Sequence, residues 1–94
     1  MPYLLVRHKV EEYAKWKTLF DEQAATRQEG GSRGGQLFRN VNDPNELVIL
    51  FAWDDLGHAS QFIQSEELRQ VMQQAGVEGS PDIYFLEAVE HIPA

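Results

Sequence analysis

Hydrophobic side chains along this sequence change their spacing several times, and each change marks the boundary of an expected element. The segment Tyr3–Val10 is rich in strand-forming residues and apolar in its first half, which predicts a strand nearly buried on both faces. From Glu11 the spacing becomes helical, and this amphipathic helix is expected to end at Gly30 and Gly31, because glycine accepts left-handed backbone angles. One side of the helix is formed by residues at steps of three and four, namely Tyr13, Trp16, Phe20, Ala24 and Arg27.

The middle of the chain predicts a β-hairpin. A strand pattern covers Gly34–Asn40, and Asn42–Asn45 is a strong turn signal. The strand that follows, Glu46–Trp53, has no polar position after its first residue, so both of its faces are expected to be covered. Its side chains fall into two sets that point to opposite faces, with Leu47, Ile49, Phe51 and Trp53 in one set and Val48, Leu50 and Ala52 in the other.

The last third of the chain predicts two short helices and a strand. Asp54 or Asp55 is expected to cap a helix over residues 56–63, and a break follows near Ser65. Ser65 is expected to cap the second helix, which Gly76 ends. The final strand is expected over Asp82–Glu90.

The predicted order β-α-β-β-α-β, with the second helical section divided in two, indicates an α+β fold of the ferredoxin-like class in one domain spanning residues 1–94. Such a chain forms a four-stranded antiparallel sheet with its helices on one face. The other face would expose a contiguous apolar surface, which soluble monomers seldom tolerate. We therefore expect two copies to pair face to face as a homodimer.

Composition and charge narrow the function. The 94 residues include no cysteine, which excludes disulfides, thiolate chemistry and cysteine metal sites and fits a cytoplasmic location. The formal net charge is −7, which disfavours nucleic acid and anionic lipid as partners. No apolar run is long enough to span a membrane.

Several segments carry a resemblance to a known family, among them Val6–Val10, Tyr13–Trp16, Leu37–Glu46, Trp53–Leu56 and Tyr84–Glu87. The sequence resembles the dimeric α+β barrel superfamily, in particular the small proteins of the antibiotic biosynthesis monooxygenase type, over nearly its whole length. The resemblance implies a dimeric barrel. It also implies, as one function of the superfamily, oxidation of quinol-like or anthrone-like aromatic compounds without metal or flavin. The Asn, Trp and His triad of the haem-degrading branch is not matched here.

His8 is the first candidate for chemistry, because it shares a face with Leu4 and Val6 on the expected first strand. An imidazole in a sheet interior can take a proton from a phenol or enol near neutral pH, so His8 is the candidate base. The alternative is a structural histidine that bonds to the backbone or to Glu87 or Glu90 of the last strand.

Arg39 is the candidate anchor for the resulting anion, although salt bridges with nearby carboxylates are the alternative for both Arg39 and Arg7. For Arg7 we favour the salt bridge. A pocket for a small aromatic ligand can be lined by Trp53, Phe38, Phe51 and Tyr84, and the same residues can equally fill a core or a dimer interface.

Other patterns argue against bound groups. The glycine-rich segment Gly30–Gly35 lacks the lysine of a phosphate loop and follows a helix. It is therefore expected to end the helix and form a turn. His58 and His91 have no partner at metal-ligand spacing, and no dinucleotide fingerprint is present. We therefore expect no metal and no cofactor. Three functions stay open, which are a cofactor-independent monooxygenase, a non-catalytic ligand-binding dimer and a structural dimer.

Overall fold

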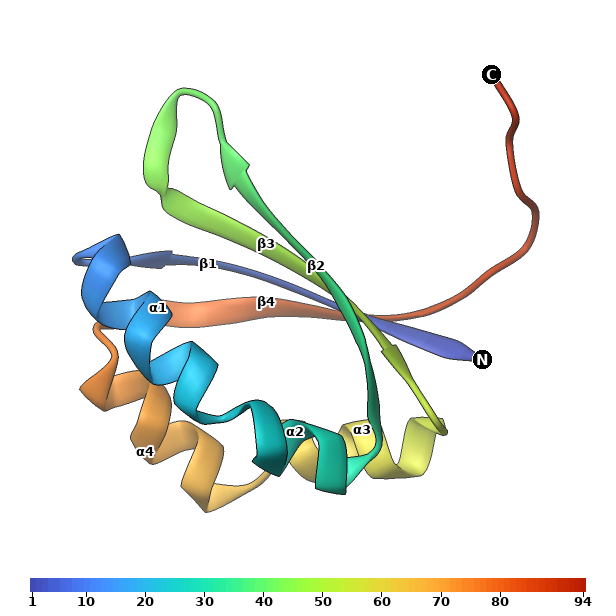
Figure 1. Ribbon diagram of the computed structural model, residues 1–94, viewed down its shortest axis with the longest axis horizontal. Coiled ribbons are helices and arrows are strands. Elements are labelled where there is room, and N and C mark those ends of the chain that lie inside the picture. The colour runs from blue at the N-terminus through green and yellow to red at the C-terminus, as the bar shows by residue number, and fades with distance from the viewer.

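The computed structural model describes all residues from 1 to 94 and contains one sheet and four helices. The elements in chain order are β1 (Pro2–Val10), α1 (Tyr13–Glu22), α2 (Ala24–Gly30), β2 (Ser32–Asn40), β3 (Asp43–Trp53), α3 (Leu56–Ile63), α4 (Glu66–Gln74) and β4 (Val77–Glu87). The strands are antiparallel in the order β2-β3-β1-β4, and all helices lie on one side of the sheet (Figure 1). The ferredoxin-like α+β fold expected from the sequence is confirmed.

The two central strands, β1 and β3, set which side chains face the helices. Their register pairs Leu4 with Phe51, Val6 with Ile49 and His8 with Leu47, and paired residues share a face of an antiparallel sheet. This face holds the core, since its apolar residues from Leu4 to Val10 and from Leu47 to Trp53 are all buried. The buried set on these strands is Leu4, Val6, Val10, Leu47, Ile49, Phe51 and Trp53.

The helix caps form as the sequence predicts for the second half of the chain. Asp55, rather than Asp54, caps α3 by accepting a hydrogen bond from the His58 backbone N–H at 2.8 Å. Ser65 caps α4 by accepting from the Leu68 N–H at 3.2 Å. None of the four helices is long and apolar enough to cross a membrane.

The first helical section differs from the prediction, because it is not one continuous helix but breaks at Gln23 into α1 and α2. At the break the Phe20 carbonyl accepts two hydrogen bonds, one from the Gln23 N–H at 3.2 Å and one from Arg27 Nη1 at 2.8 Å. The arginine side chain thus holds a carbonyl at the end of α1. Gly31 then ends α2 with a φ of 122°, as the glycine pair predicted.

The last strand was also predicted wrongly, since β4 spans Val77–Glu87 instead of Asp82–Glu90. Pairing with β1 is interrupted by a bulge, and residues 79–81 on β4 have no partner there. Pro81 is tolerated at this point because β4 is an edge strand and the bulge needs no N–H from it. After Glu87 the chain leaves the sheet as an extended tail (Figure 1).

The sheet face away from the helices has no cover within the chain, and we call it the open sheet face. Its apolar positions on β1 and β3 are only partly buried, and Arg7, which pairs with Val48 in the sheet, adds an exposed charge to the same face. Phe38 and Tyr84 extend the same surface on the outer strands, with 46% and 55% of their surface exposed. The apolar members of the open sheet face are Tyr3, Leu5, Phe38, Val48, Leu50, Ala52, Tyr84 and Leu86.

Gly35 permits the close approach of β2 to β3. A Cβ atom at this position would lie 2.1 Å from the Leu50 carbonyl oxygen and 2.9 Å from the Phe51 Cα, which is closer than real Cβ atoms come. Both neighbours are backbone atoms of β3, so neither can move without shifting the strand.

We expect Gly35→Ala to lower the free energy of unfolding by about 2 kcal/mol, because the added methyl group forces the two strands apart. Urea-induced unfolding followed by circular dichroism measures this change. Gly30→Ala is the matched control, because a Cβ there meets only Phe62 and Trp53 side chains at 3.7 Å and 3.8 Å. A Gly35→Ala protein as stable as the Gly30→Ala protein would show that the strand approach is not limiting.

Candidate functional site

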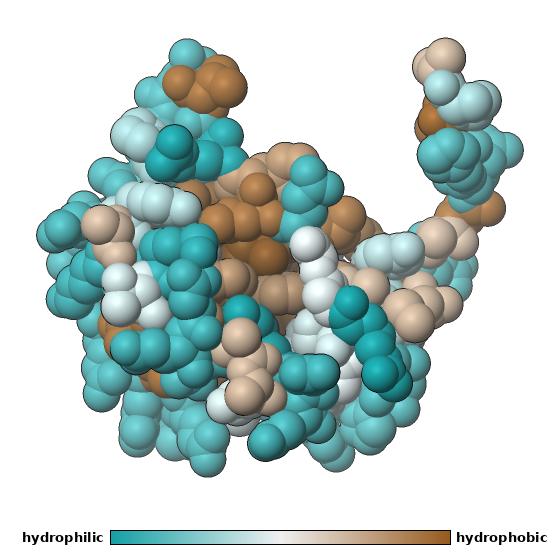
Figure 2. Space-filling view, viewed as in Figure 1, coloured by the Kyte–Doolittle hydropathy of each residue, from teal (hydrophilic) through white to brown (hydrophobic).

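A small cavity lies between the sheet and the helices, with His8 in its wall. Its volume is about 70 Å³, and eleven of its fourteen lining residues are hydrophobic. We call it the His8 cavity, and the residues used below are His8, Trp16, Phe20, Arg27 and Phe51. In the space-filling view, hydrophobic surface is visible in a hollow between the helices and the strands (Figure 2).

His8 is held in this cavity by the strand pattern that places Leu4, Val6 and Val10 in the core. It is 8% exposed, and its Nδ1 atom is buried without a hydrogen-bond partner. Burial lowers the pKa of His8 below its ordinary value of 6.5, and a weaker interaction with its own backbone acts in the other direction. The imidazole is thus neutral at neutral pH and has a free ring nitrogen. The carboxylate partner considered for a structural histidine is not present.

Aromatic rings continue from His8 along the cavity. The Trp16 ring meets the imidazole edge-on at 5.6 Å between centroids, and it stacks on Phe20 at 4.7 Å. Phe20 in turn lies 6.3 Å from Phe51, which belongs to β3. The cavity is therefore bounded by flat apolar surfaces that suit an aromatic ligand.

A wider groove adjoins the His8 cavity on the side of β2, and we call it the outer groove. It is open to solvent, has a volume of about 650 Å³ and shares Phe20, Arg27, Ile49 and Phe51 with the cavity. Arg27 therefore borders both spaces. Its guanidinium carbon lies 3.8 Å from the Phe20 ring centroid and 5.8 Å from that of Phe51.

The candidate residues from the sequence are placed in three different surroundings. His8 and Phe51 line the same cavity. Trp53 is fully buried, donates from Nε1 to the Gly30 carbonyl at 3.2 Å and fills the core. Phe38 and Tyr84 belong to the open sheet face, opposite His8.

The two candidate arginines of the strands also lie outside the His8 cavity. Arg39 shares the helix-facing side with His8 but is separated from it by the width of β3, and its guanidinium carbon lies 4.9 Å from the Tyr13 ring centroid. Arg7 forms salt bridges with Glu46 at 3.2 Å and Asp82 at 3.1 Å. The salt bridge favoured for Arg7 is confirmed.

The sequence analysis did not single out two residues that line the cavity, Trp16 and Arg27. Both belong to the helical stripe that the spacing identified, so they were treated as helix packing. The signal that was available is a charge on an otherwise apolar stripe, since an arginine at a core-facing position needs a specific reason to be there.

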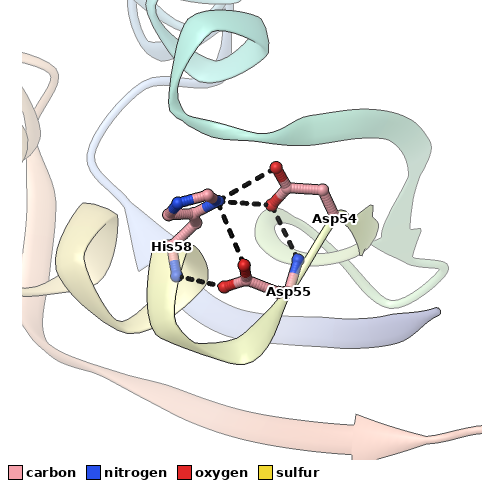
Figure 3. Close-up of side chains that lie close together, drawn as sticks. All are labelled: Asp54, Asp55 and His58. Atoms are coloured by element: carbon pink, nitrogen blue, oxygen red, sulfur yellow. Dashed lines mark hydrogen bonds and ion pairs between the residues drawn. The ribbon is translucent and has the colours of Figure 1, made fainter.

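A second polar cluster is formed by Asp54, Asp55 and His58 at the start of α3 (Figure 3). His58 Nδ1 lies 3.0 Å from both Asp54 carboxylate oxygens and 3.4 Å from Asp55 Oδ2. Hydrogen bonding to Asp54 raises the pKa of His58, and the charges of Asp54 and Asp55 add to this effect. The three residues explain one another as a helix cap and an ion pair, so the cluster carries no assignment of a metal.

Comparison with known proteins places this fold among related structures. A family model described as antibiotic biosynthesis monooxygenase matches residues 5–74. A crystal structure of an antibiotic biosynthesis monooxygenase is 20% identical with a TM-score of 0.73, over 96% of this chain and 100% of the other. No protein with a curated description matches the sequence.

Two further structures are similar in fold. SnoaB from Streptomyces nogalater, described as a cofactor-independent oxygenase, is 16% identical with a TM-score of 0.78, over 99% of this chain and 97% of SnoaB. Rv0793 from Mycobacterium tuberculosis is 15% identical with a TM-score of 0.69, over 97% and 98% of the two chains. At these identities the likeness is one of fold.

The opposite environments of His8 and His58 predict opposite effects on stability as the pH falls. The folded pKa of His8 is below 6.5, so on acidification through 6.5 the unfolded chain binds a proton that the folded chain does not, and stability is lost. The folded pKa of His58 is above 6.5, so its stabilising contribution is fully present below 6.5 and is lost as the pH rises through the folded pKa.

We expect His8→Gln to lose less free energy of unfolding than the wild type between pH 7 and pH 5, because the group that resists protonation is gone. His58→Gln is expected to lose more than the wild type over the same interval. Urea unfolding at both pH values measures the differences. Identical pH dependence in His8→Gln and the wild type would mean that His8 titrates alike in the folded and unfolded chains.

Proposed function

The chain belongs to the antibiotic biosynthesis monooxygenase family, and on this premise we propose that it binds a small electron-rich aromatic compound at the His8 cavity and oxidises it with dioxygen, as a homodimer and without a cofactor. The single observation that carries the proposal is the buried, unpaired Nδ1 of His8 beside an aromatic cavity. A neutral imidazole in such a place is suited to accept a proton from a substrate. The description of SnoaB as a cofactor-independent oxygenase supports the same chemistry.

The proposed reaction draws its electrons from the substrate. His8 takes a proton from a CH2 group between aromatic rings or from a quinol hydroxyl, and the resulting anion reacts with dioxygen. For a CH2 group, one oxygen atom enters the product as a carbonyl and the other leaves as water, so the substrate supplies all four electrons. For a quinol, the substrate gives two electrons and two protons to dioxygen, and the products are the quinone and hydrogen peroxide. The proton held by His8 leaves with the water or with the peroxide.

The aromatic rings that line the cavity keep water away from the reacting substrate. Trp16 and Phe51 present ring surfaces that exclude water from the substrate, and a low dielectric strengthens the interaction of the anion with any nearby charge. The cavity of about 70 Å³ is smaller than the roughly 150 Å³ of a protein cavity that binds benzene. A substrate ring therefore occupies the cavity only together with part of the outer groove, across the border lined by Phe20, Arg27 and Phe51.

One alternative is a binding protein without turnover, and the lining of the cavity favours it. No carboxylate lines the cavity or the outer groove. His8 therefore has no acidic partner that could orient its imidazole ring or take over the proton that it accepts. In this alternative the ligand binds in the same place, and saturable binding is observed without oxygen consumption.

The homodimer is proposed from the open sheet face. Leu50 lies near its centre on β3, with Gln36 on one side and Leu5 on the other. Face-to-face pairing of two such sheets removes both apolar surfaces from water, which is the main source of free energy for association. The two sheets then close the barrel that the resemblance implies.

For the enzyme, we expect His8→Gln to lower the rate of oxygen consumption with anthrone at pH 7 by about 100-fold or more, because the variant has no proton acceptor. An oxygen electrode and the absorbance of anthraquinone measure the rate. His58→Gln is the control, since His58 is on the outside of α3, and it is expected to keep wild-type activity.

Equal turnover by His8→Gln and the wild type would remove His8 from the mechanism. Absence of oxygen consumption by the wild type with anthrone and with naphthalene-1,4-diol would reject the oxygenase proposal for these substrates and leave the binding protein.

For the dimer, we expect Leu50→Glu to yield monomers, because the interface would have to bury an unpaired charge. Light scattering after gel filtration is expected to give twice the 10.8 kDa chain mass for the wild type and the single chain mass for the variant. Leu56→Glu introduces the same charge at a leucine of α3 that is 52% exposed, and it is expected to stay dimeric. A dimeric Leu50→Glu protein would place the interface elsewhere.

A further inference from the structure

The charge around the cavity and groove is opposite to that of the whole chain. The sequence has fifteen acidic and eight basic residues, yet the two spaces together are lined by three cations and no carboxylate. The three cations are Lys17, Arg27 and Arg33. Asp21 pairs with Lys17 and its charge also acts on Arg27, but no carboxylate lines the hollow itself, so this acidic protein presents there a local site for an anion.

Arg27 is the cation that lies deepest. It is half-buried, and it alone among the three lines both the outer groove and the His8 cavity. It has no carboxylate within 4.0 Å, while its neighbour Lys17 is paired with Asp21 at 2.6 Å. One of its five N–H donors bonds the Phe20 carbonyl, which leaves the others free for a ligand.

Burial next to two aromatic rings makes this arrangement costly for the empty protein. Desolvation lowers the pKa of Arg27, and the charge of Asp21 acts in the opposite direction. A guanidinium taken partly out of water is normally compensated by an anion. Here no carboxylate pairs with Arg27 directly, and the compensation within the chain comes from one carbonyl, the ring faces and the more distant charge of Asp21.

We infer that Arg27 binds a carboxylate carried by the aromatic ligand, so that the ligand is an aromatic acid with its ring toward His8 and its carboxylate at the border of the outer groove. The planar guanidinium matches a carboxylate with two parallel hydrogen bonds. A carboxylate at this border stays in contact with water through the groove, whereas the anion formed in the reaction lies deeper, beside the imidazole.

Arg27 suits this role better than the other arginines near the sheet. Arg33 is exposed and lines only the outer groove, where its charge also acts on Asp54. Arg39 lies over Tyr13, outside both spaces. The inference deepens the proposed function, since it names the class of ligand for the same site, but it depends only on ligand binding and not on turnover.

The experiment uses 2-naphthoate, methyl 2-naphthoate and 2-naphthol as probes, with titration calorimetry at pH 7 on the full chain. None of them has a CH2 group between rings or a quinol pair, so binding is measured without oxidation. We expect Arg27→Gln to raise the dissociation constant for 2-naphthoate by about tenfold or more, because a charge-assisted pair is lost. The constants for the ester and for 2-naphthol are expected to stay within about twofold.

Arg69→Gln is the matched control, because it removes the same charge from α4, where Arg69 is exposed and pairs with Glu66. It is expected to bind 2-naphthoate as the wild type does. If Arg69→Gln and Arg27→Gln weaken the binding of 2-naphthoate equally, the effect comes from the net charge of the protein, and the inference is overturned. An equal loss for 2-naphthol would assign Arg27 to the phenolic oxygen, and failure of 2-naphthoate to bind the wild type would also overturn it.

Arg27 packs on Phe20, so a folding defect in Arg27→Gln is tested separately. In the wild type, the Arg27 Nε–H resonance is expected to shift on addition of 2-naphthoate more than the Arg39 Nε–H resonance does. An Arg27 resonance that does not respond to the ligand would overturn the inference without any variant. Naphthoate binding through Arg27 in a protein that consumes no oxygen would keep the inference and reject the oxygenase.

Discussion

Antiparallel pairing of β1 with β3 in the centre of the sheet fixes which side chains face the helices. In a strand, neighbouring residues point to opposite faces, so a slip of one residue would move His8 from the cavity to the open sheet face. The register is held because both strands carry large apolar residues at the helix-facing positions, from Leu4 to Val10 and from Leu47 to Trp53. The position of the site is thus a consequence of the core.

The same constraint explains how much the sequence could predict. The order of the elements, the burial of His8, a cap at Asp54 or Asp55 and a cap at Ser65 follow from period and local chemistry. All of them are found, with Asp55 as the first cap. At the break at Gln23 the Arg27 side chain donates to the Phe20 carbonyl, a side-chain-to-backbone contact that the spacing of apolar residues does not encode. The early start of β4 depends on pairing with β1, which outweighs the turn preference of residues 79–81.

The site itself was only partly accessible to sequence reasoning. Strand parity grouped His8 with Leu4 and Val6 on one strand, and Phe51 with Ile49 and Trp53 on another. Which of these residues border a cavity depends on how the strands pair and how the helices lie over the sheet. Trp53 lies under the end of α2 and fills the core, whereas Trp16 on α1 lies beside His8. Arg27 could be singled out only in the folded chain, because only there is it seen to border two spaces that no carboxylate lines.

The bulge in β4 makes the edge strand next to His8 easier to open locally than the centre of the sheet. His8 has a register partner in β3 but none in β4, where pairing resumes only at Glu78. The end of the edge strand beyond the bulge is held by few pairs, so it can open as a local unit while the central pair of strands stays closed. We therefore expect the amides of Val77 and Glu78 to exchange their hydrogens through local opening of this end, and those of the central β1–β3 pair to exchange only when the domain unfolds.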